Sequence, residues 1–470
     1  MIRRGNPRNT ACALALLACT GCALQVPPPV SPEVPAAFQN LGPAADAPAQ
    51  WPARDWYRGF GSPDLDALIE AAASANLDMA GAQARLAQAD ARARQAGAAL
   101  LPSVDAVGNG NFLAGHARGA SAHELDWSAL LSASYEIDFW GRNRATARAA
   151  RFRGAAARAD RDTLALTTLA GVADGYFELL ALRERLQIAL ANRDAARALL
   201  AVIQARFDAG QSDPVTLATQ RGVLAAAQLV IPDLQARAAA ALAALAVLVG
   251  RPPEGFQVGA AGLDALREPQ VAPGLPMALI TRRPDVSLAE ANLRAADADL
   301  VAARAALLPS LTLTAAAGLQ NPAMNAAVIA LSGTGPGLNL GAGLVQTIFD
   351  GGRLRAVRDE TRARDAELLA AYRGAILAAL VDVENALTSV QDLDAQRAFQ
   401  EAALAQSEQA FAGAQARYRA GAGDYLTVLE AQRSLYAVRD QYRQYRLARL
   451  QSRVALCKAL GGGWTRPEQD

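Results

Sequence analysis

The sequence predicts a mixed α/β membrane protein: a trimeric, 12-stranded transmembrane β-barrel, with about four strands per chain, continuous with a long α-helical barrel. Three observations predict this fold. The chain repeats itself after about 211 residues, strand-like segments alternate apolar and polar side chains, and the segments between them are long, rich in alanine and free of proline. QARFDAGQSD at residues 204–213 returns as QARYRAGAGD at 415–424, which indicates an internal twofold repeat.

Size and charge exclude one class of partner. The chain has 470 residues, of which 52% are hydrophobic, and a formal net charge of +1 at pH 7. A chain of this size and composition can bury large cores. Binding of nucleic acid depends on a surplus of positive charge, which this chain lacks. We therefore expect no nucleic acid among its partners.

The N-terminus has the pattern of a secretory signal peptide, which we place at residues 1–21. Two arginines precede an apolar stretch that is too short to span a bilayer, and small residues follow it. CTGC at residues 19–22 resembles the bacterial lipoprotein cleavage box, so we expect a covalent lipid on Cys22. An ordinary leader that is cut elsewhere is the alternative. The Pro-rich residues 22–55 should form a lipid-anchored extended segment.

The first structural repeat is placed at residues 56–265 and contains a β-hairpin at about 103–139. From Leu125 to Phe139 the odd positions are apolar and most even positions are polar. Aromatic residues flank about ten residues of this segment, which is typical of a strand that crosses an outer membrane. A soluble β-sandwich would show a similar alternation, so the hairpin alone does not decide between the two.

The second repeat is placed at residues 266–464, with a hairpin at about 310–349, and a C-terminal tail follows at 465–470. Its strands show the same alternation. Four strands cannot close a barrel, and an open edge cannot lie in lipid because its amide groups would lack partners. Other chains must therefore complete the barrel, and three copies supply about twelve strands around an open lumen.

Two proline-free segments of about 67 residues, 143–209 and 353–420, can each form one helix about 100 Å long. Shorter helices are expected after them, at about 214–249 and 425–460. An apolar seam with coiled-coil spacing on the first long helix returns on the second. The seam consists of Leu169, Val172, Tyr176, Leu179 and Leu182, and then of Leu380, Val383, Leu387, Val390 and Leu393. A soluble coiled-coil rod is the alternative, but it would not need the aromatic-flanked strands.

Three segments together resemble a known family. They are RRPDVSLAEANLRAADADLVAARAALLPS at residues 282–310, AGAGDYLTVLEAQRSLY at 420–436 and KALGGGW at 458–464. With them the chain resembles the TolC-like outer membrane factor family, specifically the NodT/OprM-type outer membrane efflux lipoproteins. The resemblance implies a homotrimer, lipid-anchored in the cell outer membrane, whose α-barrel lies in the periplasm.

The resemblance also implies a function. The chain would be the outer membrane channel of a tripartite efflux or export system. This passive exit duct would receive substrates from an inner-membrane pump, of the RND type, through a periplasmic adaptor (membrane fusion) protein. The alternative is a periplasmic lipid-anchored coiled-coil adaptor or structural protein, which needs one helical hairpin and a compact β domain rather than two similar copies. Drugs, metal ions, oligosaccharides and proteins all remain possible cargo.

The turns between the long and the shorter helices are the first candidate site. Gly210 and Gly421 can end the long helices, and Asp213 and Asp424 can cap the helices that follow. Helix capping alone is the alternative explanation. The resemblance implies in addition that these turns form the periplasmic tip that faces the adaptor.

A second candidate site follows the second turn. Leu426, Glu430 and Arg433 are four and then three residues apart, which places them on one helical face. The resemblance implies that these positions line a closed periplasmic gate. Three copies of Glu430 would bring like charges together, a cost that nearby arginine and water would offset. The alternative is a solvated Glu–Arg pair on an exposed face.

No pattern in the sequence supports catalysis. The two histidines, His116 and His123, are expected in the loop of the first hairpin, and the cysteines lack the spacing of metal ligands. Gly-Gly-Arg at residues 351–353 lacks the Lys-Ser/Thr of a phosphate-binding loop, so it indicates a strand-to-helix turn. We therefore expect neither an enzyme nor a metal, and no cofactor other than the lipid on Cys22.

Overall fold

The computed structural model describes residues 35–39, 50–117, 120–259, 261–271, 274–320 and 337–466. The expected signal peptide, Cys22 and most of the Pro-rich segment lie outside the described residues. The tail is described only as far as Arg466.

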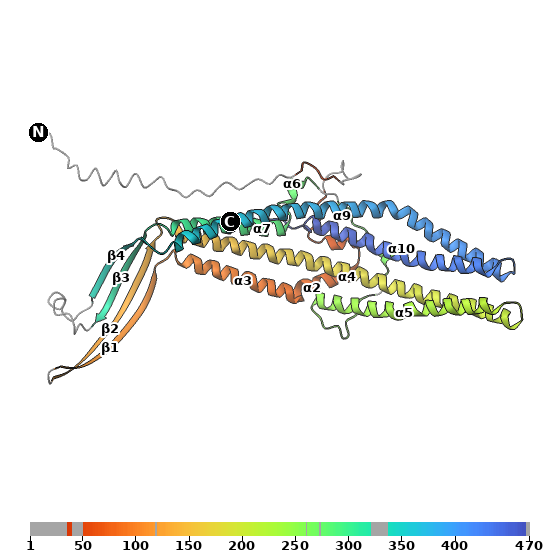
Figure 1. Cartoon of the computed structure of the whole chain (residues 1–470), viewed down its shortest axis with the longest axis horizontal. Helices are drawn as coiled ribbons and strands as arrows, with labels where there is room; N and C mark the ends of the chain where they lie inside the picture. Colours follow the sequence, from red (N-terminus) through yellow and green to blue (C-terminus); the bar gives the residue numbers. More distant parts are fainter. Residues whose placement is uncertain are drawn as a thin grey trace. The chain divides into compact units, whose positions relative to one another are not determined.

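Each half of the chain places two strands between a shorter helix and a 67-residue helix (Figure 1). The first half contains η3 (Trp56–Phe60), α2 (Pro63–Ala75), α3 (Leu77–Ala98), β1 (Ser103–Ala117), β2 (Ala120–Ile137), α4 (Arg142–Asp208) and α5 (Pro214–Val249). The second half contains η4 (Leu263–Ala265), α6 (Pro276–Leu279), α7 (Pro284–Ala305), β3 (Ser310–Gln320), β4 (Gly337–Val345), α9 (Arg353–Arg419) and α10 (Tyr425–Ala459).

The two long helices, α4 and α9, begin and end within one residue of the bounds that the sequence suggests. Their length reflects the absence of proline, which would remove a backbone donor, and the abundance of alanine, the best helix former. The shorter helix α5 contains Pro232 and nevertheless continues to Val249. A single proline is therefore not sufficient to end α5.

The chain packs into two compact units. One unit contains the sheet and the helix segments next to it, at residues 87–156 and 289–372. The other contains the described parts of residues 33–86, 157–288 and 373–470. Each unit takes segments from both halves of the sequence, so the compact units differ from the division into two consecutive repeats.

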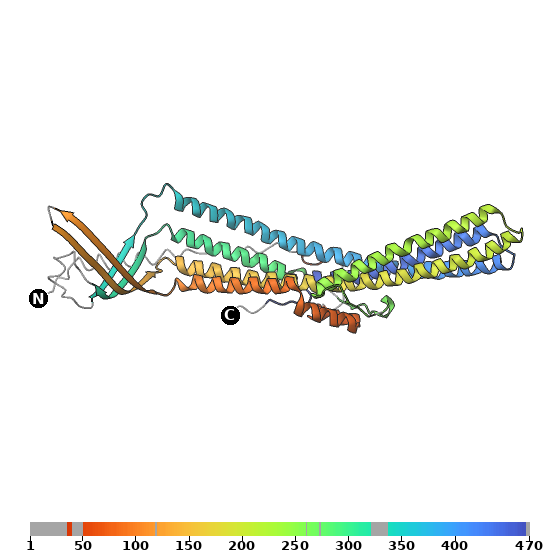
Figure 2. The same ribbon diagram turned by 90° about the horizontal axis from the view of Figure 1, so that it is seen from below.

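In the first unit, the four strands form one antiparallel sheet in the order β1-β2-β3-β4 (Figure 2). Leu131 of β2 lies between Ala106 of β1 and Ala317 of β3, and Ala315 of β3 lies beside Leu340 of β4. The strands therefore share one register across the whole sheet, and β1 and β4 form its edges.

The strands of the first hairpin, with 15 and 18 residues, are longer than expected. The ladder continues to the pair Ala117↔Ala120, so His116 lies in β1 and His123 in β2. The expectation that both histidines lie in a loop was wrong. Cross-strand backbone pairing extends the hairpin through residues whose own strand preference is weak.

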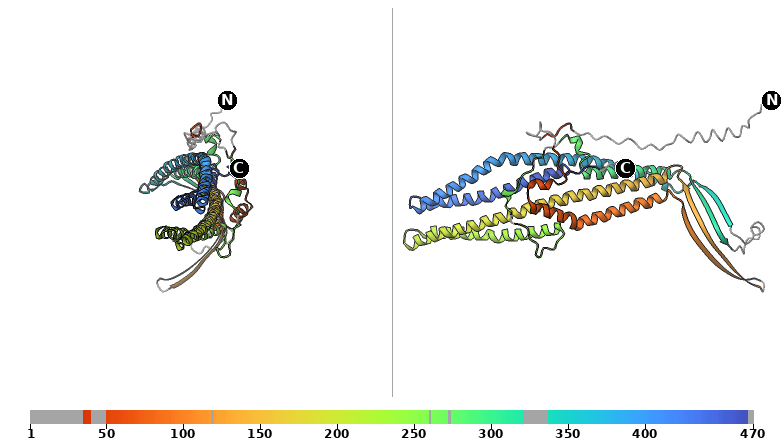
Figure 3. Two further views of the ribbon diagram at one scale, coloured as in Figure 1. Left: turned by 90° about the vertical axis from the view of Figure 1, so that its right-hand side faces the viewer. Right: turned by 180° about the vertical axis from the view of Figure 1, so that it is seen from behind.

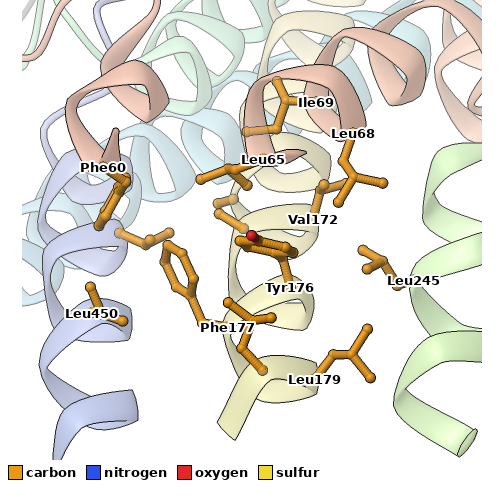
Figure 4. Close-up of a cluster of buried hydrophobic side chains, with 14 of the residues drawn as sticks. Phe60, Leu65, Leu68, Ile69, Val172, Tyr176, Phe177, Leu179, Leu245 and Leu450 are labelled. Atoms are coloured by element: carbon orange, nitrogen blue, oxygen red, sulfur yellow. The ribbon is translucent and has the colours of Figure 1, made fainter. Parts of the chain in front are cut away.

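The largest apolar core lies in the second unit, between α2, α4, α5 and α10 (Figure 4). Tyr176 and Phe177 of α4 are fully buried, and the ring centroids of Phe177 and Phe60 are 5.0 Å apart. The Tyr176 hydroxyl forms a hydrogen bond of 3.0 Å with Oγ of Ser62. The same Oγ accepts from the backbone N–H of Leu65 and caps α2. Packing and capping together hold α2 on α4.

Two helices, α4 and α5, contain an 18-residue stretch that is long and apolar enough to cross a membrane by length and composition alone. Half of this stretch in α4 is buried within the fold. The buried half of this stretch belongs to the core. In α5 only 22% of the stretch is buried, which leaves an apolar helix surface exposed on the single chain.

Candidate functional site

The sheet has two chemically different faces. Side chains of directly paired residues lie on the same face, so the register assigns each strand residue to one face or the other. One face is apolar and exposed on the single chain: Leu131, Leu340 and Leu344 are 60%, 76% and 70% exposed. The opposite face is mainly polar, although Val107, Leu130 and Val345 belong to it. Its polar members include Ser103, Asp105, Asn109, Ser128, Ser132, Ser134, Glu136, Ser310, Thr312, Thr314 and Asn339.

This arrangement suits a barrel wall better than a soluble sheet. A soluble sheet covers its apolar face with helices or a second sheet, whereas here residues such as Leu340 remain exposed. The edges β1 and β4 each pair with one strand within the chain. In hydrocarbon, the free backbone groups of both edges would need partners from another chain.

Aspartates fix the two passages from strand to long helix. The Asp138 carboxylate accepts from the backbone N–H groups of Asn143 and Arg144 at 2.9 and 2.8 Å. Burial alone would raise the pKa of Asp138, but these hydrogen bonds hold it below its usual range. Asp350 caps α9 in a similar way, with bonds of 3.0 Å from the N–H groups of Gly352 and Leu354. Neither cap was identified from the sequence, although an aspartate shortly before a helix is a recognised capping signal.

The two helical turns have matching geometry and lie at the same end of the second unit (Figure 3). Gly210 and Gly421 adopt the left-handed conformation, with φ of 68° and 73°. Asp213 accepts from the N–H groups of Val215 and Thr216, and Asp424 accepts from that of Thr427. The structure thus gives all four tip residues a local role in the helix ends. Contact with an adaptor remains a prediction.

Residues not identified from the sequence join the ends of the two helical hairpins. Arg206 of α4 donates to the backbone oxygen of Tyr418 at 2.9 Å, and its guanidinium lies 4.3 Å from the centre of the Tyr418 ring. Tyr425 donates to Gln220 of α5 at 2.8 Å. Next to these contacts, Ile203 and other residues of α4, α5, α9 and α10 form a small apolar core. The two turns are therefore coupled within one chain.

The three gate candidates lie together on the exposed face of α10. Leu426 is 61% exposed, and Glu430 and Arg433 are also exposed. The opposite face of α10 is buried, with Val428 and Leu435 in contact with the rest of the chain. Sequence spacing and structure agree that the three side chains share one face, while a role in gating remains a prediction.

A partly buried network of ion pairs anchors the segment between α5 and α6 to α9 and α10. Arg449 pairs with Glu268 at 2.5 Å and with Asp394 at 3.0 Å, and Arg453 pairs with Asp394 at 2.8 Å. The side chains of both arginines are less than a tenth exposed. The partners are far apart in the sequence, so spacing gives no signal for them.

The described residues contain no cluster of three or more His, Cys, Asp or Glu side chains that could hold a metal ion. Cys457 is buried in the large core, and burial raises the pKa of its thiol to about 12. A thiol with this pKa is a poor nucleophile at neutral pH.

Comparison with known proteins identifies a family, several relatives and similar solved structures. A family model described as outer membrane efflux protein matches residues 68–251 and 275–462. The pyoverdine export outer membrane protein OpmQ of Pseudomonas aeruginosa is 43% identical over 443 residues, which cover 90% of this chain and 92% of the relative. The cation efflux system protein CusC of Escherichia coli K12 is 30% identical over 452 residues, covering 95% and 97%. The structure of the outer-membrane channel OprN matches with a TM-score of 0.84 at 27% identity, covering 93% and 99%.

One relative is named as an outer membrane protein of pyoverdine export and the other as a cation efflux system protein, and the similar structure is an outer-membrane channel. The predicted location in the outer membrane and the predicted function as an efflux channel are confirmed. The alternative of a lipid-anchored periplasmic adaptor is not favoured. The chain belongs to the outer membrane efflux protein family.

Proposed function

We propose that three copies of the chain assemble into one exit duct, in which β4 of each sheet pairs with β1 of the next. Three four-stranded sheets would give a barrel of 12 strands. The apolar face would contact lipid and the polar face would line the lumen, as in other outer membrane barrels. The observation that carries this proposal is the two-faced sheet with an open strand at each edge.

In this assembly the two halves of the chain act as structural repeats. The helices α4 and α9 have the same length, and Asp213 and Asp424 cap the next helix with nearly the same backbone angles. Each chain would thus contribute two similar helical hairpins to a ring of six. The helices would form the wall of the duct in the periplasm.

We assign the constriction of this duct to Leu426, Glu430 and Arg433. The three side chains are exposed on the single chain and lie on the face of α10 that is not used for packing. Around a threefold axis, three copies of Glu430 and Arg433 would form a ring of alternating charges. Leu426 would narrow the opening on the side of the turn.

The turns at Gly210–Asp213 and Gly421–Asp424 would meet a periplasmic adaptor, which connects the duct to an inner-membrane pump, in our proposal one of the RND type. The relatives are named for pyoverdine, cations and toluene. Cargo this varied supports selection by the pump rather than by the duct. A lipid on Cys22 would hold the chain at the membrane, and no other cofactor is needed.

The assembly can be tested by disulfide crosslinking across the proposed sheet edges. Within one chain β1 and β4 are separated by two strands, about 14 Å from edge to edge, which is too far for a disulfide. Paired variants that combine Asp105→Cys with Gly341→Cys, Gly343→Cys or Val345→Cys should therefore crosslink only between chains and give covalent trimers. Monomers from every pair, in protein extracted from the outer membrane, would contradict the proposed closure.

The gate can be tested by single-channel recording in planar bilayers. Leu426→Ala and Glu430→Gln should raise the resting conductance. The matched control substitutions are Val215→Ala and Thr219→Ala, which lie at the corresponding positions of α5, about 211 residues earlier. Equal conductance of wild-type and gate-variant trimers would remove Leu426 and Glu430 from the constriction, and equal effects of both pairs would show that the tip as a whole loosens.

A further inference from the structure

Three arginines near the start of α4, the helix that follows β2, line a groove in the first unit. Arg144, Arg148 and Arg151 lie four and three residues apart on one face of α4, and all three line a cavity of about 330 Å³. Trp140, Leu100 and Val301 also line this cavity and add apolar surface to it. The Trp140 ring is held in place, since its Nε1 donates to the backbone oxygen of Pro309 at 2.8 Å.

The charge of the groove is not balanced within the described chain. Residues 142–159 contain six arginines and no acidic residue, although cations are unfavourable near a helix N-terminus. Arg144 pairs with Asp138 at 3.1 Å. Arg148 and Arg151, by contrast, have no acidic partner among the described residues. An anion in the groove would compensate both guanidinium groups.

Contacts within the first unit indicate which face of the sheet lies on the same side as the groove. Arg142 pairs with Glu136 at 2.5 Å, and Glu136 belongs to the polar face of the sheet. Successive residues of a helix turn by about 100°, so Arg144, Arg148 and Arg151 lie about 180–240° around α4 from Arg142. The groove is therefore on the side of the apolar sheet face, which in the proposed duct is the side of the lipid.

The arginine side chains of the groove are long enough to reach the headgroup layer. Arg151 lies about 14 Å along the axis from the first residue of α4, and the headgroup region of one leaflet is about 5–8 Å thick. Helical side chains tilt toward the N-terminus, here toward the sheet, and long arginine side chains extend further in that direction. The guanidinium groups can thus reach the phosphates of the periplasmic leaflet.

We propose that this groove binds the phosphate group of a phospholipid in the periplasmic leaflet of the outer membrane. Arg148 and Arg151 would donate to the phosphate oxygens, because the planar guanidinium matches phosphate geometry. Trp140, Leu100 and Val301 would contact the glycerol and the first methylene groups. The inference rests on the proposed orientation of the sheet in the duct.

The second half of the chain provides a matched control. The residues of α9 that correspond to Arg144, Arg148 and Arg151 are Arg355, Asp359 and Arg362. Asp359 occupies the central position and pairs with Arg358 at 2.7 Å. The corresponding face of α9 therefore has less uncompensated positive charge, and the same number of arginines can be removed there.

Native mass spectrometry of the full-length protein in detergent can measure the binding of a short-chain phosphatidylglycerol. The double variant Arg148→Gln/Arg151→Gln should bind this lipid about tenfold more weakly than wild type, a loss of about 1.4 kcal/mol. The control Arg355→Gln/Arg362→Gln should bind it like wild type. A diacylglycerol of equal chain length, which lacks the phosphate, should bind equally to all three proteins.

Two outcomes would overturn the lipid site. One is equal phosphatidylglycerol binding by both double variants. The other is displacement of the lipid by inorganic phosphate at the same concentration, which would indicate a site for a free anion. Conductance in planar bilayers, recorded on the same preparations, tests the duct separately. A variant that binds lipid more weakly but conducts normally would show that the substitution affects this groove and leaves the duct intact.

Discussion

The carboxylate of Asp174 is expected to destabilise the protein at neutral pH. The side chain is partly buried in the middle of α4, and its Oδ1 has no hydrogen-bond partner among the described residues. Burial raises the pKa of Asp174 from 3.8 to about 6, against the opposing effect of Lys458. The substitution Asp174→Asn removes the charge and keeps the shape of the side chain.

The size and sign of the effect follow from this pKa. A shift of about two units corresponds to about 3 kcal/mol between the charged and the neutral form. Because the pKa of the folded state lies above that of the unfolded state, the folded state binds more protons between about pH 4 and pH 6. The contribution of Asp174 to stability is therefore most favourable below about pH 4, falls as the pH rises and stays at its minimum above about pH 6.

Thermal unfolding, followed by circular dichroism at about pH 8 and about pH 4, can check this expectation. Asp174→Asn should raise the unfolding midpoint at the higher pH, by up to the equivalent of about 3 kcal/mol, and change it little at the lower pH. Asp233→Asn is the control, since Asp233 is 56% exposed and pairs with Arg237 on the surface of α5. An unchanged midpoint of Asp174→Asn at pH 8 would refute the argument that burial of this charge costs stability.

Four further substitutions have expected effects on stability or folding. Asp213→Ala and Asp424→Ala should each lower the free energy of unfolding by about 1 kcal/mol through loss of a helix cap; urea unfolding with no change would contradict the capping role. Gly461→Ala should reduce the yield of folded protein, because Gly461 has a φ of +87° and a Cβ there would overlap the backbone oxygen of Arg282. Arg449→Met should lower the free energy of unfolding by about 2 kcal/mol, since it removes charge-assisted hydrogen bonds to Glu268 and Asp394, which keep Arg446 and Arg453 as their partners; a midpoint like that of wild type would show that these remaining arginines compensate both carboxylates.

The helices could be predicted well from the sequence because their signals are local. The residues of the apolar seam, such as Val172 and Tyr176, are buried as their spacing suggests, and Val383 of the second long helix is buried as well. The helix ends could also be predicted, because Gly210 is a strong signal for the end of a helix and Asp213 for the start of the next one. The alternation in β2 identified its apolar face for the same reason.

Contacts between distant residues could not be predicted. Arg206 meets Tyr418 across 212 positions of the sequence, and Arg449 meets Glu268 across 181. The sequence shows many arginines and acids, and only the packing of the helices determines which of them are neighbours. Strand length was misjudged for a related reason, since the extension of β1 to Ala117 depends on its partner strand rather than on its own residues.

The open edges of the sheet have a consequence for genetics. If three chains share one barrel, a subunit with a damaged β1 or β4 edge can still enter the assembly through its intact edge. Cells that produce such a subunit together with the normal one would then have few fully normal barrels. Mutations at the edge strands should therefore be dominant over the normal gene, whereas mutations that prevent folding altogether should be recessive.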